Sequence, residues 1–374
     1  MINKRFFEAV CLAGLLGAGC SSSQKATAPK VSSLGEAYKK DFLIGTALNN
    51  AHILERDSLA NQLIKQQFTA ATPENIMKAE VLHTGWEKYN FEMADKIVAY
   101  GQKNNIKINA HTLIWHSQLP FFIRGIKSAD SIKAYFENHI TTVASRYDGK
   151  VYSWDVVNEA LNEDGTMRNS VFLKNLGPGY IVEAFRLAQK AAPNTQLYYN
   201  DYNIEAPKKR AGALEIVKKI QAAGVKIDGV GIQGHWHLGT VPYKDIEESI
   251  EAFGKLGVQV MFTELDISVL PNPLRGNTAD VSARADENSA NRGNPYVKGL
   301  PDSIQLALAK DYEKLFRLFL KHKDKVTRIT FWGVTDGGSW LNDFPVRGRT
   351  NYPLLFDRKY QPKPAFYSVY NLKK

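Results

Sequence analysis

The chain has 374 residues, of which 44% are hydrophobic and 11% are aromatic, so it can bury a large core. Its length allows roughly two or three domains, although barrels of about 200 to 400 residues also fold as one domain. The formal net charge of +10 would suit nucleic acid, an anionic membrane or an acidic substrate. Lys and Arg are scattered among acidic residues, with only short clusters such as residues 207–210, which favours a solvated surface over nucleic-acid binding.

The first residues have the pattern of an export signal. Positive charges at residues 4–5 precede an apolar segment, residues 10–18, that is too short to cross a bilayer as a mature helix. We therefore predict that residues 1–19 are a lipoprotein-type signal peptide and that the mature protein leaves the cytoplasm.

Cys11 and Cys20 are the two cysteines of the chain. Residues 16–20, Leu-Gly-Ala-Gly-Cys, resemble a bacterial lipobox, whose cysteine is lipid-modified and becomes the mature N-terminus; Gly17 departs from the pattern, because an aliphatic residue is usual there. Loss of Cys11 with the signal would exclude a disulfide and a paired-thiolate metal site from the mature chain. Residues 20–33 predict a flexible tether. We expect an outer-membrane or cell-surface lipoprotein anchored through Cys20, or otherwise a periplasmic or secreted protein.

From residue 34 onwards, short apolar runs alternate with amphipathic stretches in chain order. The runs that predict strands are residues 41–48, 68–74, 107–116, 152–159, 196–203, 229–235, 259–267 and 328–334. The stretches with helical spacing are residues 53–67, 91–104, 131–147, 180–191, 208–223, 246–255, 304–322 and 364–372. Repeated strand–helix units predict an α/β fold with one (β/α)8 TIM barrel over residues 34–374, and a doubly wound open sheet is the alternative.

Polar residues gather at the C-terminal ends of the predicted strands, where a barrel places its chemistry. They occupy residues 74–75, 111–118, 158–159, 200–203, 233–235, 264, 266 and 336–340. The helical stretches lack such a clustering. This asymmetry predicts a single active site at one end of the barrel.

Glu159 and Glu264 each stand at the end of an apolar strand, where a charge is costly unless it is paired or used. Two carboxyl groups across a cleft suit glycoside hydrolysis, since one can protonate the leaving oxygen while the other attacks the anomeric carbon or activates water. Strand-end tryptophans offer ring faces for sugars. A metal hydrolase is the competing hypothesis, but no HxH or HExxH pattern is accompanied by a metal-bridging Lys or Asp. We predict no metal and no cofactor.

Seven motifs on successive strand ends resemble those of family-10 glycoside hydrolases, the retaining endo-β-1,4-xylanases. The matching segments are Glu74-Asn-Ile-Met-Lys78, residues 111–120, Trp154-Asp-Val-Val-Asn-Glu159, Tyr199-Asn-Asp-Tyr-Asn203, Gly231-Ile-Gln-Gly-His235, Thr263-Glu-Leu-Asp266 and Trp332-Gly-Val-Thr-Asp336. The resemblance covers nearly the whole mature chain. It implies an enzyme that cleaves internal β-1,4-xylosidic bonds in xylan, with xylan and xylo-oligosaccharides as its binding partners.

The resemblance also implies roles for individual residues. Glu159 would be the general acid/base and Glu264 the nucleophile. Asn158 would hydrogen-bond the 2-hydroxyl of the sugar being cleaved, and His235 would bridge Glu264 and Asp266. Substrate-binding residues would be Glu74, Asn75, Lys78, His111, Trp115, Gln118, Gln233, Trp332 and Trp340.

Some questions stay open at this point. Residues 268–303 form an unusually long connection, expected to overhang the leaving-group side of the cleft, and calcium binding there is an alternative. We expect Asp155 to be a structural ion-pair member and the protein to be a monomer. Activity on β-1,4-glucan and a glycan-binding barrel without turnover are the functional alternatives; the intact pair of glutamates disfavours the second.

Overall fold

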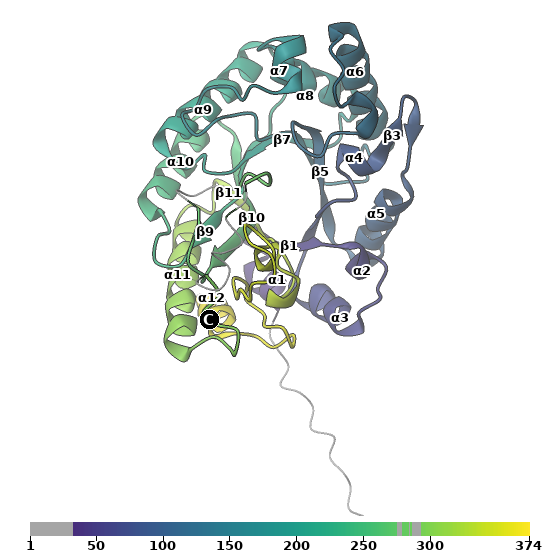
Figure 1. The fold of residues 1–374 in the computed structure, drawn as a ribbon. Helices are drawn as coiled ribbons and strands as arrows, with labels where there is room; N and C mark the ends of the chain where they lie inside the picture. The colour runs from purple at the N-terminus through teal and green to yellow at the C-terminus, as the bar shows by residue number, and fades with distance from the viewer. Residues whose placement is uncertain (1–32, 275–278, 284, 286–292) are drawn as a thin grey trace, which may run out of the picture. The chain divides into compact units, whose positions relative to one another are not determined.

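Parallel strands close into a barrel, as the strand–helix alternation predicts (Figure 1). The computed structural model describes residues 33–274, 279–283, 285 and 293–374. The eight barrel strands are β1 (Leu43–Leu48), β2 (Ala70–Pro73), β5 (Lys107–Trp115), β6 (Ser153–Asn158), β7 (Gln196–Asp201), β8 (Gly229–Ile232), β10 (Gln259–Ser268) and β11 (Val326–Phe331). Because β11 pairs with both β10 and β1, the eight strands form a closed ring, and the alternative of an open doubly wound sheet is wrong.

The longer helices lie outside the strands and cover them (Figure 1). They are α3 (Ser58–Gln67), α5 (Glu92–Asn104), α6 (Ala129–Arg146), α8 (Tyr180–Ala191), α9 (Pro207–Ala222), α10 (Tyr243–Lys255), α11 (Asp302–Lys321) and α12 (Pro364–Asn371), while the short helix α1 (Leu34–Tyr38) precedes β1. Residues at the N-terminal ends of these helices determine where the helices begin. Asp57 accepts a hydrogen bond from the backbone of Ala60 at the start of α3, and Pro207 occupies the first turn of α9, where a missing N–H costs nothing.

Short elements build the connections between strands and helices. They are α2 (Asn50–Ile53), α4 (Ala79–Leu82), the hairpin β3 (His83–Gly85) and β4 (Lys88–Tyr89), η1 (Phe121–Ile123), α7 (Val171–Leu176), β9 (His235–His237), η3 (Asp336–Gly338) and η4 (Trp340–Asn342). Two expectations need correction. The helix expected over residues 53–67 breaks at residues 54–57, where Asp57 caps a new helix. The strand expected over residues 229–235 divides into β8 and β9, because Gly234 takes a positive φ of 85° between them.

A glycine at the centre of the barrel makes room for a polar side chain. A Cβ atom added to Gly231 would lie 2.3 Å from Asn200 Oδ1, which is far inside van der Waals contact. Gly231 on β8 and Asn200 on β7 are register partners, so any larger residue at 231 would displace Asn200. The glycine therefore helps to position Asn200 in the site described below.

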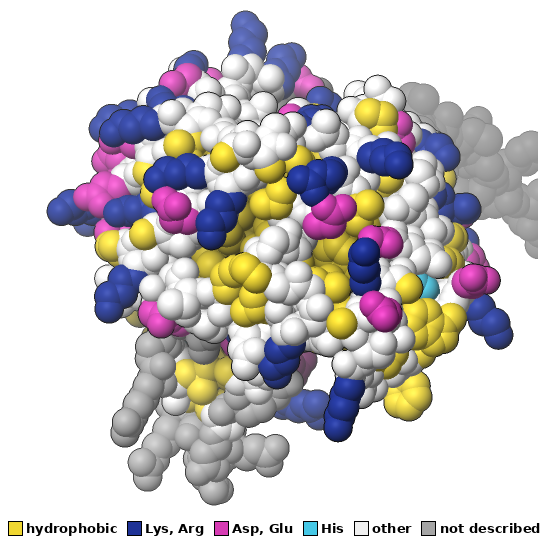
Figure 2. Space-filling view, turned by 90° about the horizontal axis from the view of Figure 1, so that it is seen from above, with side chains coloured by type: hydrophobic (Ala, Val, Ile, Leu, Met, Phe, Trp, Pro, Cys, Tyr) yellow, Lys and Arg dark blue, Asp and Glu magenta, His cyan; other side chains and the backbone are white. Residues whose placement is uncertain are grey.

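The surface and the N-terminal segment bear on location. Figure 2 shows Lys and Arg side chains interspersed with Asp and Glu over the face in view, as expected for a solvated surface. Across the described ranges, no helix combines the length and the apolar character that a membrane crossing requires. The predicted signal peptide, Cys20 and residues 20–32 lie outside the described residues, and Ser33 caps α1 by accepting a hydrogen bond from Glu36 N.

Candidate active site

Polar side chains from the C-terminal ends of the barrel strands converge on one cleft. The predicted residues that line it are Glu74, Asn75, Lys78, His111, Trp115, Gln118, Asn158, Glu159, Gln233, His235, Glu264, Trp332 and Trp340. Asp266 is fully buried and contacts His235. The long connection after β10 contributes Ala279 and Val281 to the lining, which the sequence did not predict individually.

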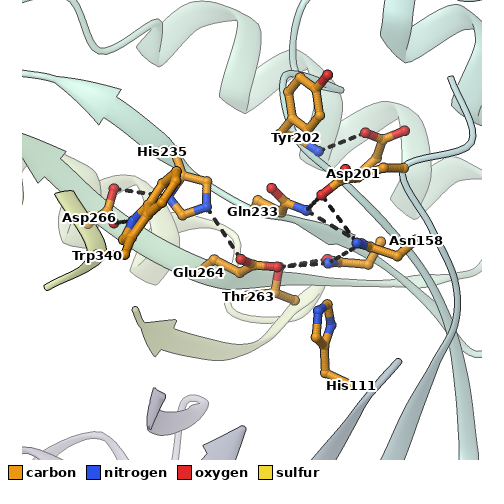
Figure 3. A network of polar contacts seen from close by, with 12 residues as sticks. His111, Asn158, Asp201, Tyr202, Gln233, His235, Thr263, Glu264, Asp266 and Trp340 are labelled. Carbon is orange, nitrogen blue, oxygen red and sulfur yellow. Dashed lines mark hydrogen bonds and ion pairs between the residues drawn. The ribbon is translucent and has the colours of Figure 1, made fainter. Parts of the chain in front are cut away.

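Glu264 and Asp266 lie on the same face of β10, because side chains two apart in a strand point the same way. His235 on β9 is the register partner of Asp266, so the imidazole lies between the two carboxylates (Figure 3). Its Nδ1 is 3.0 Å from Asp266 Oδ1, and its Nε2 is 3.4 Å from Glu264 Oε2. Trp340 donates its indole N–H to the other oxygen of Asp266 at 2.8 Å.

The charges of this group support one another. Burial alone would lower the pKa of His235, but Asp266 and then Glu264 outweigh it and raise that pKa to about 10. The imidazole is therefore a cation at neutral pH. For Glu264, burial acts to raise the pKa, while the hydrogen bond from His235 and the nearby cationic groups lower it below its ordinary value. Glu264 is consequently held as a carboxylate in a buried position.

Glu159 follows β6 in a left-handed backbone conformation, with φ of 55°. Such a conformation is uncommon for a residue other than glycine and persists where surrounding contacts hold it. Arg168 donates from Nε to the carbonyl oxygen of Glu159 at 3.2 Å. The carboxyl group accepts hydrogen bonds from Trp115 Nε1 at 2.9 Å and from Gln233 Nε2 at 3.0 Å. Its backbone and its carboxyl group are thus both fixed.

The electrostatic environment of Glu159 is opposite to that of Glu264. Burial is the largest influence and raises the pKa of Glu159, and the negative charges of Asp201 and Glu264 add to it. The hydrogen bonds from Gln233 and Trp115 act the other way, and the resulting pKa is about 7. One cleft therefore holds a carboxyl group that keeps its proton near neutrality and another that does not.

Amide side chains connect the two glutamates. Asn200 Nδ2 donates to Glu264 Oε1 at 3.1 Å and to Asn158 Oδ1 at 3.0 Å. Asn158 Nδ2 in turn donates to Glu159 Oε1 at 3.2 Å. Thr263 Oγ1 donates to Asn200 Oδ1 at 2.7 Å and fixes which end of that amide faces the carboxylates. The relative placement of Glu159 and Glu264 is therefore set by a chain of hydrogen bonds that passes through the side chains of Asn200 and Asn158.

Comparison with known proteins identifies the family to which the chain belongs. Residues 33–372 match the family model described as glycosyl hydrolase family 10. The chain belongs to this family. It is 39% identical over 352 residues to endo-1,4-beta-xylanase A of Xylanibacter ruminicola, covering 93% of this chain and 95% of that protein. It is 40% identical over 373 residues to a beta-1,4-xylanase of Dictyoglomus thermophilum, covering 99% of each.

Solved structures of family-10 members superpose on the chain. A family-10 endoxylanase retrieved from a sugarcane soil metagenome is 41% identical, with a TM-score of 0.86, covering 91% of this chain and 99% of that one. Xylanase 10B of Thermotoga petrophila RKU-1, solved in complex with xylobiose, is 34% identical with a TM-score of 0.79, covering 91% of this chain and 97% of that one. The predicted fold and family are confirmed.

One end of the cleft of this family-10 hydrolase is built around Lys78. Its ammonium group donates to Asn75 Oδ1 and to Gln118 Oε1, both at 2.9 Å, and lies 4.9 Å from the centre of the Trp115 ring. Lys78 thus covers part of Trp115, whose indole N–H is used by Glu159, so the tryptophan is more than the open stacking surface that we expected. Burial raises the pKa of Glu74 to about 7 against the lowering effect of Lys78.

Aromatic rings and a histidine form the adjoining wall. Trp340 lies against His235 with ring centroids 5.0 Å apart, and Trp332 meets His111 edge-on at 5.9 Å. His111 Nδ1 is 2.9 Å from Asp155 Oδ2, a contact that is an ion pair when His111 is protonated, so the structural role expected for Asp155 stays a prediction.

Several residues behind Glu159 were missed by sequence reasoning. Lys209, on the outer helix α9, is fully buried and pairs with Asp201 Oδ1 at 3.1 Å. Its ammonium group also lies 3.5 Å from the centre of the Tyr202 ring. Arg168 bonds Tyr202 Oη at 2.8 Å and Asp280, from the long connection, at 3.3 Å. Lysine and arginine residues on a helix or loop are usually exposed to solvent. The local sequence therefore gave no reason to predict that Lys209 and Arg168 lie behind Glu159.

The cleft histidines are engaged with carboxylates rather than arranged as a metal site. His111 is paired with Asp155 and His235 with both Asp266 and Glu264. A set of side chains with metal-ligand spacing, Glu247, Glu251 and His322, lies at α10 and the end of α11, not in the cleft. Glu247 in that set is also paired with Lys321.

Proposed function

We propose that this family-10 hydrolase is a retaining endo-β-1,4-xylanase in which Glu159 is the general acid/base and Glu264 the nucleophile. The enzyme hydrolyses internal β-1,4-xylosidic bonds of xylan. What carries the residue assignment is a hydrogen-bonded chain that joins two buried carboxyl groups whose pKa values are shifted in opposite directions. The names of the relatives, which are xylanases, support the choice of substrate.

The first half of the reaction uses both groups at once. Glu264, ionised and held by His235, attacks the anomeric carbon and forms a covalent bond as the glycosidic C–O bond breaks. Glu159, protonated near neutral pH, gives its proton to the departing oxygen. The products of this step are a glycosyl-enzyme ester at Glu264 and a shortened xylan chain with a free hydroxyl group.

The second half reverses these roles. Glu159, now a carboxylate, takes a proton from a water molecule, whose oxygen attacks the anomeric carbon and releases Glu264. The cation on His235 stabilises Glu264 as it regains its charge. Two inversions at the same carbon give net retention of configuration.

The remaining cleft residues hold the sugar. Asn158 bonds the 2-hydroxyl of the sugar being cleaved, and Gln233 and His111 contact the same sugar. Residues towards the non-reducing end are Glu74, Asn75, Lys78, Trp115 and Gln118, with Trp332 and Trp340 as walls. Protonated Glu74 can donate as well as accept a hydrogen bond, which suits a hydroxyl-rich ligand.

Reducing-sugar release from xylan and from carboxymethylcellulose tests the activity and the assignment together. We expect release from xylan by the wild type, and a loss of at least about a thousandfold in kcat for Glu264→Ala, because the covalent path is removed. Equal release by Glu264→Ala would overturn the nucleophile assignment. If the wild type released no reducing sugar from either polymer, the proposal that the protein is an enzyme would be wrong. The alternative of a glycan-binding barrel without turnover would then remain.

The N-terminal segment supports a separate proposal about location. The mature protein is exported and anchored through a lipid on Cys20, with residues 20–33 as a tether to the barrel. Labelling of producing cells with a radioactive fatty acid is expected to tag the wild type, while Cys20→Ala is expected to remain untagged and to appear in the soluble fraction. A wild type that takes up no label would contradict the anchor.

A further inference from the structure

We propose that Trp86, Phe121 and Phe122, here called the aromatic platform, bind sugar rings of a xylan chain that extends past the cleft on the side of Lys78 and Gln118. The proposal rests on the proposed function and extends it from the catalytic cleft to a binding surface outside it. None of the three residues lines the cleft itself.

The exposure of these rings is unusual for large aromatic side chains. Phe121 is 84% exposed and Trp86 is 47% exposed. The ring of Trp86 lies 5.1 Å from that of Phe122, which follows Phe121 directly in η1, so the fold brings the two exposed residues into one region. Large hydrophobic side chains exposed singly are common, but a gathering of aromatic residues of this kind favours a surface that meets a ligand.

Two segments carry the platform, and they run side by side outward from the cleft. The first passes from Lys78 through α4 into the β3–β4 hairpin, and the second runs from Gln118 into η1. At the inner end, Lys78 Nζ donates to Gln118 Oε1 at 2.9 Å, and Glu80 N donates to Gln118 O at 3.0 Å.

The outer end of these segments joins the same surface. Figure 1 shows β3 outside α4 as seen from the barrel strands. Phe121 follows Gln118 by three residues, so the chain between them spans at most about 11 Å. The platform therefore lies only a few residues along the chain from the rim of the cleft.

Within the platform, Phe122 and the hairpin that carries Trp86 are held in place before any ligand arrives. His83 on β3 packs against Phe122 at 5.0 Å and stacks on Tyr89 of β4 at 4.1 Å, which fixes the hairpin against η1. Glu87 closes the hairpin turn with φ of 56°. Rings that are fixed in the free protein lose little conformational entropy on binding, so their contact with a ligand adds more to affinity.

The chemistry of the surroundings favours an uncharged polymer. Arg124 is paired with Glu80 beside the platform, so the nearby charges compensate one another. A pyranose ring offers an apolar C–H face that can stack on an aromatic face, while its hydroxyl groups stay in water. A neutral xylan main chain already seated in the cleft provides such rings along the same path.

The test compares long and short substrates. A Trp86→Ala, Phe121→Ala double variant is expected to reduce the ratio of kcat/KM on xylan to kcat/KM on xylotriose by roughly three- to tenfold, because only long chains reach the platform. Affinity for xylan, measured by gel retardation in a Glu264→Ala background, is expected to fall by the same factor. Tyr367→Ala is the matched control, since Tyr367 is 48% exposed on α12 and belongs to no part of the platform.

Each outcome decides the proposal. If the double variant and the Tyr367→Ala control had equal kcat/KM ratios and equal retardation by xylan, the proposed role of the platform would be wrong. The proposed xylanase activity would not be affected. A wild type inactive on xylan would instead overturn the proposed function, and xylan retardation would then test the platform by itself. Phe121→Ala alone, which alters a side chain almost wholly in solvent, repeats the measurement if the double variant fails to fold.

Discussion

Glu159 and Glu264 are the same amino acid with different protonation, and their neighbours explain the difference. Burial acts to raise the pKa of both, but only the pKa of Glu159 ends above its ordinary value. Glu264 receives the cationic His235, whereas Glu159 feels the negative charge of Asp201 and receives its hydrogen bonds from the neutral groups of Trp115, Gln233 and Asn158. This difference between the two pKa values supports the proposed assignment of Glu159 as the acid and Glu264 as the nucleophile.

The dependence of activity on pH follows from these two groups. The reaction needs Glu159 with its proton, so kcat/KM is expected to fall as pH rises through about 7, the pKa of that group. It needs Glu264 without its proton, so activity is expected to fall at acid pH, below the ordinary range of a glutamate. A plot of kcat/KM against pH for xylan hydrolysis checks both limbs.

Asp201 controls the upper limb of this profile. Asp201→Asn removes a negative charge that raises the pKa of Glu159, so the loss of activity on the alkaline side is expected at lower pH than in the wild type. Glu163→Gln is the control, because Glu163 bonds the same Lys209 at 3.1 Å but is half-exposed. A limb that moves equally in both variants, or towards higher pH in Asp201→Asn, would contradict the assignment.

The sequence could predict those parts of the site in which the contacting residues are close to one another along the chain. Glu264 and Asp266 could be predicted together because a strand places residues two apart on one face. Asn158 and Glu159 follow a strand directly. The roles of Arg168, Asp201 and Lys209 depend on how the β6 and β7 connections and α9 fold against one another, which periodicity does not encode. The indole of Trp115 was likewise expected as a stacking surface rather than as a donor to Glu159.

At the scale of elements, strong periodicity predicted the long helices and the strands well. Helix α8 has the expected bounds, residues 180–191, and β10 extends one residue beyond the expected strand. The short elements were missed because two- to four-residue segments such as β4 and α4 carry no period of their own. They form through contacts with neighbouring segments, as in the packing of His83 on Phe122.

Helix α12 supplies a stability prediction. Lys363, at its N-terminus, is buried and pairs with the fully buried Asp336 at 2.9 Å, and it also donates to the carbonyl oxygens of Tyr352 and Leu354. Lys363→Met leaves a buried carboxylate without its cation, so the free energy of unfolding is expected to fall by about 3–5 kcal/mol. Denaturant unfolding at neutral pH measures it.

A pair in which the lysine is exposed provides the comparison. Lys323→Met removes an exposed partner of Asp41, which keeps Lys373 at 2.6 Å, so a change below about 1 kcal/mol is expected. Equal losses in the two variants would mean that the burial of the Asp336–Lys363 pair has no special effect.

At the scale of the whole molecule, barrel closure is what makes one site from distant segments. Residues from Glu74 to Trp340 meet only because β11 pairs with β1 and β10. The alternation of strands and helices predicted this closure, and the strand-end clustering predicted which end of the barrel is functional. The long connection after β10 could be predicted as unusual, but the placement of Ala279 and Val281 in the cleft lining needed the structure.

The central claim is that this cleft works by double displacement, with a covalent intermediate on Glu264. The direct test is proton NMR of xylohexaose hydrolysis by the wild type during the first minutes, before the anomers of the product interconvert. Double displacement predicts that the β-anomer of the new reducing end appears first, and that the α-anomer grows only by mutarotation. Initial appearance of the α-anomer would show inversion and would exclude a covalent intermediate on Glu264.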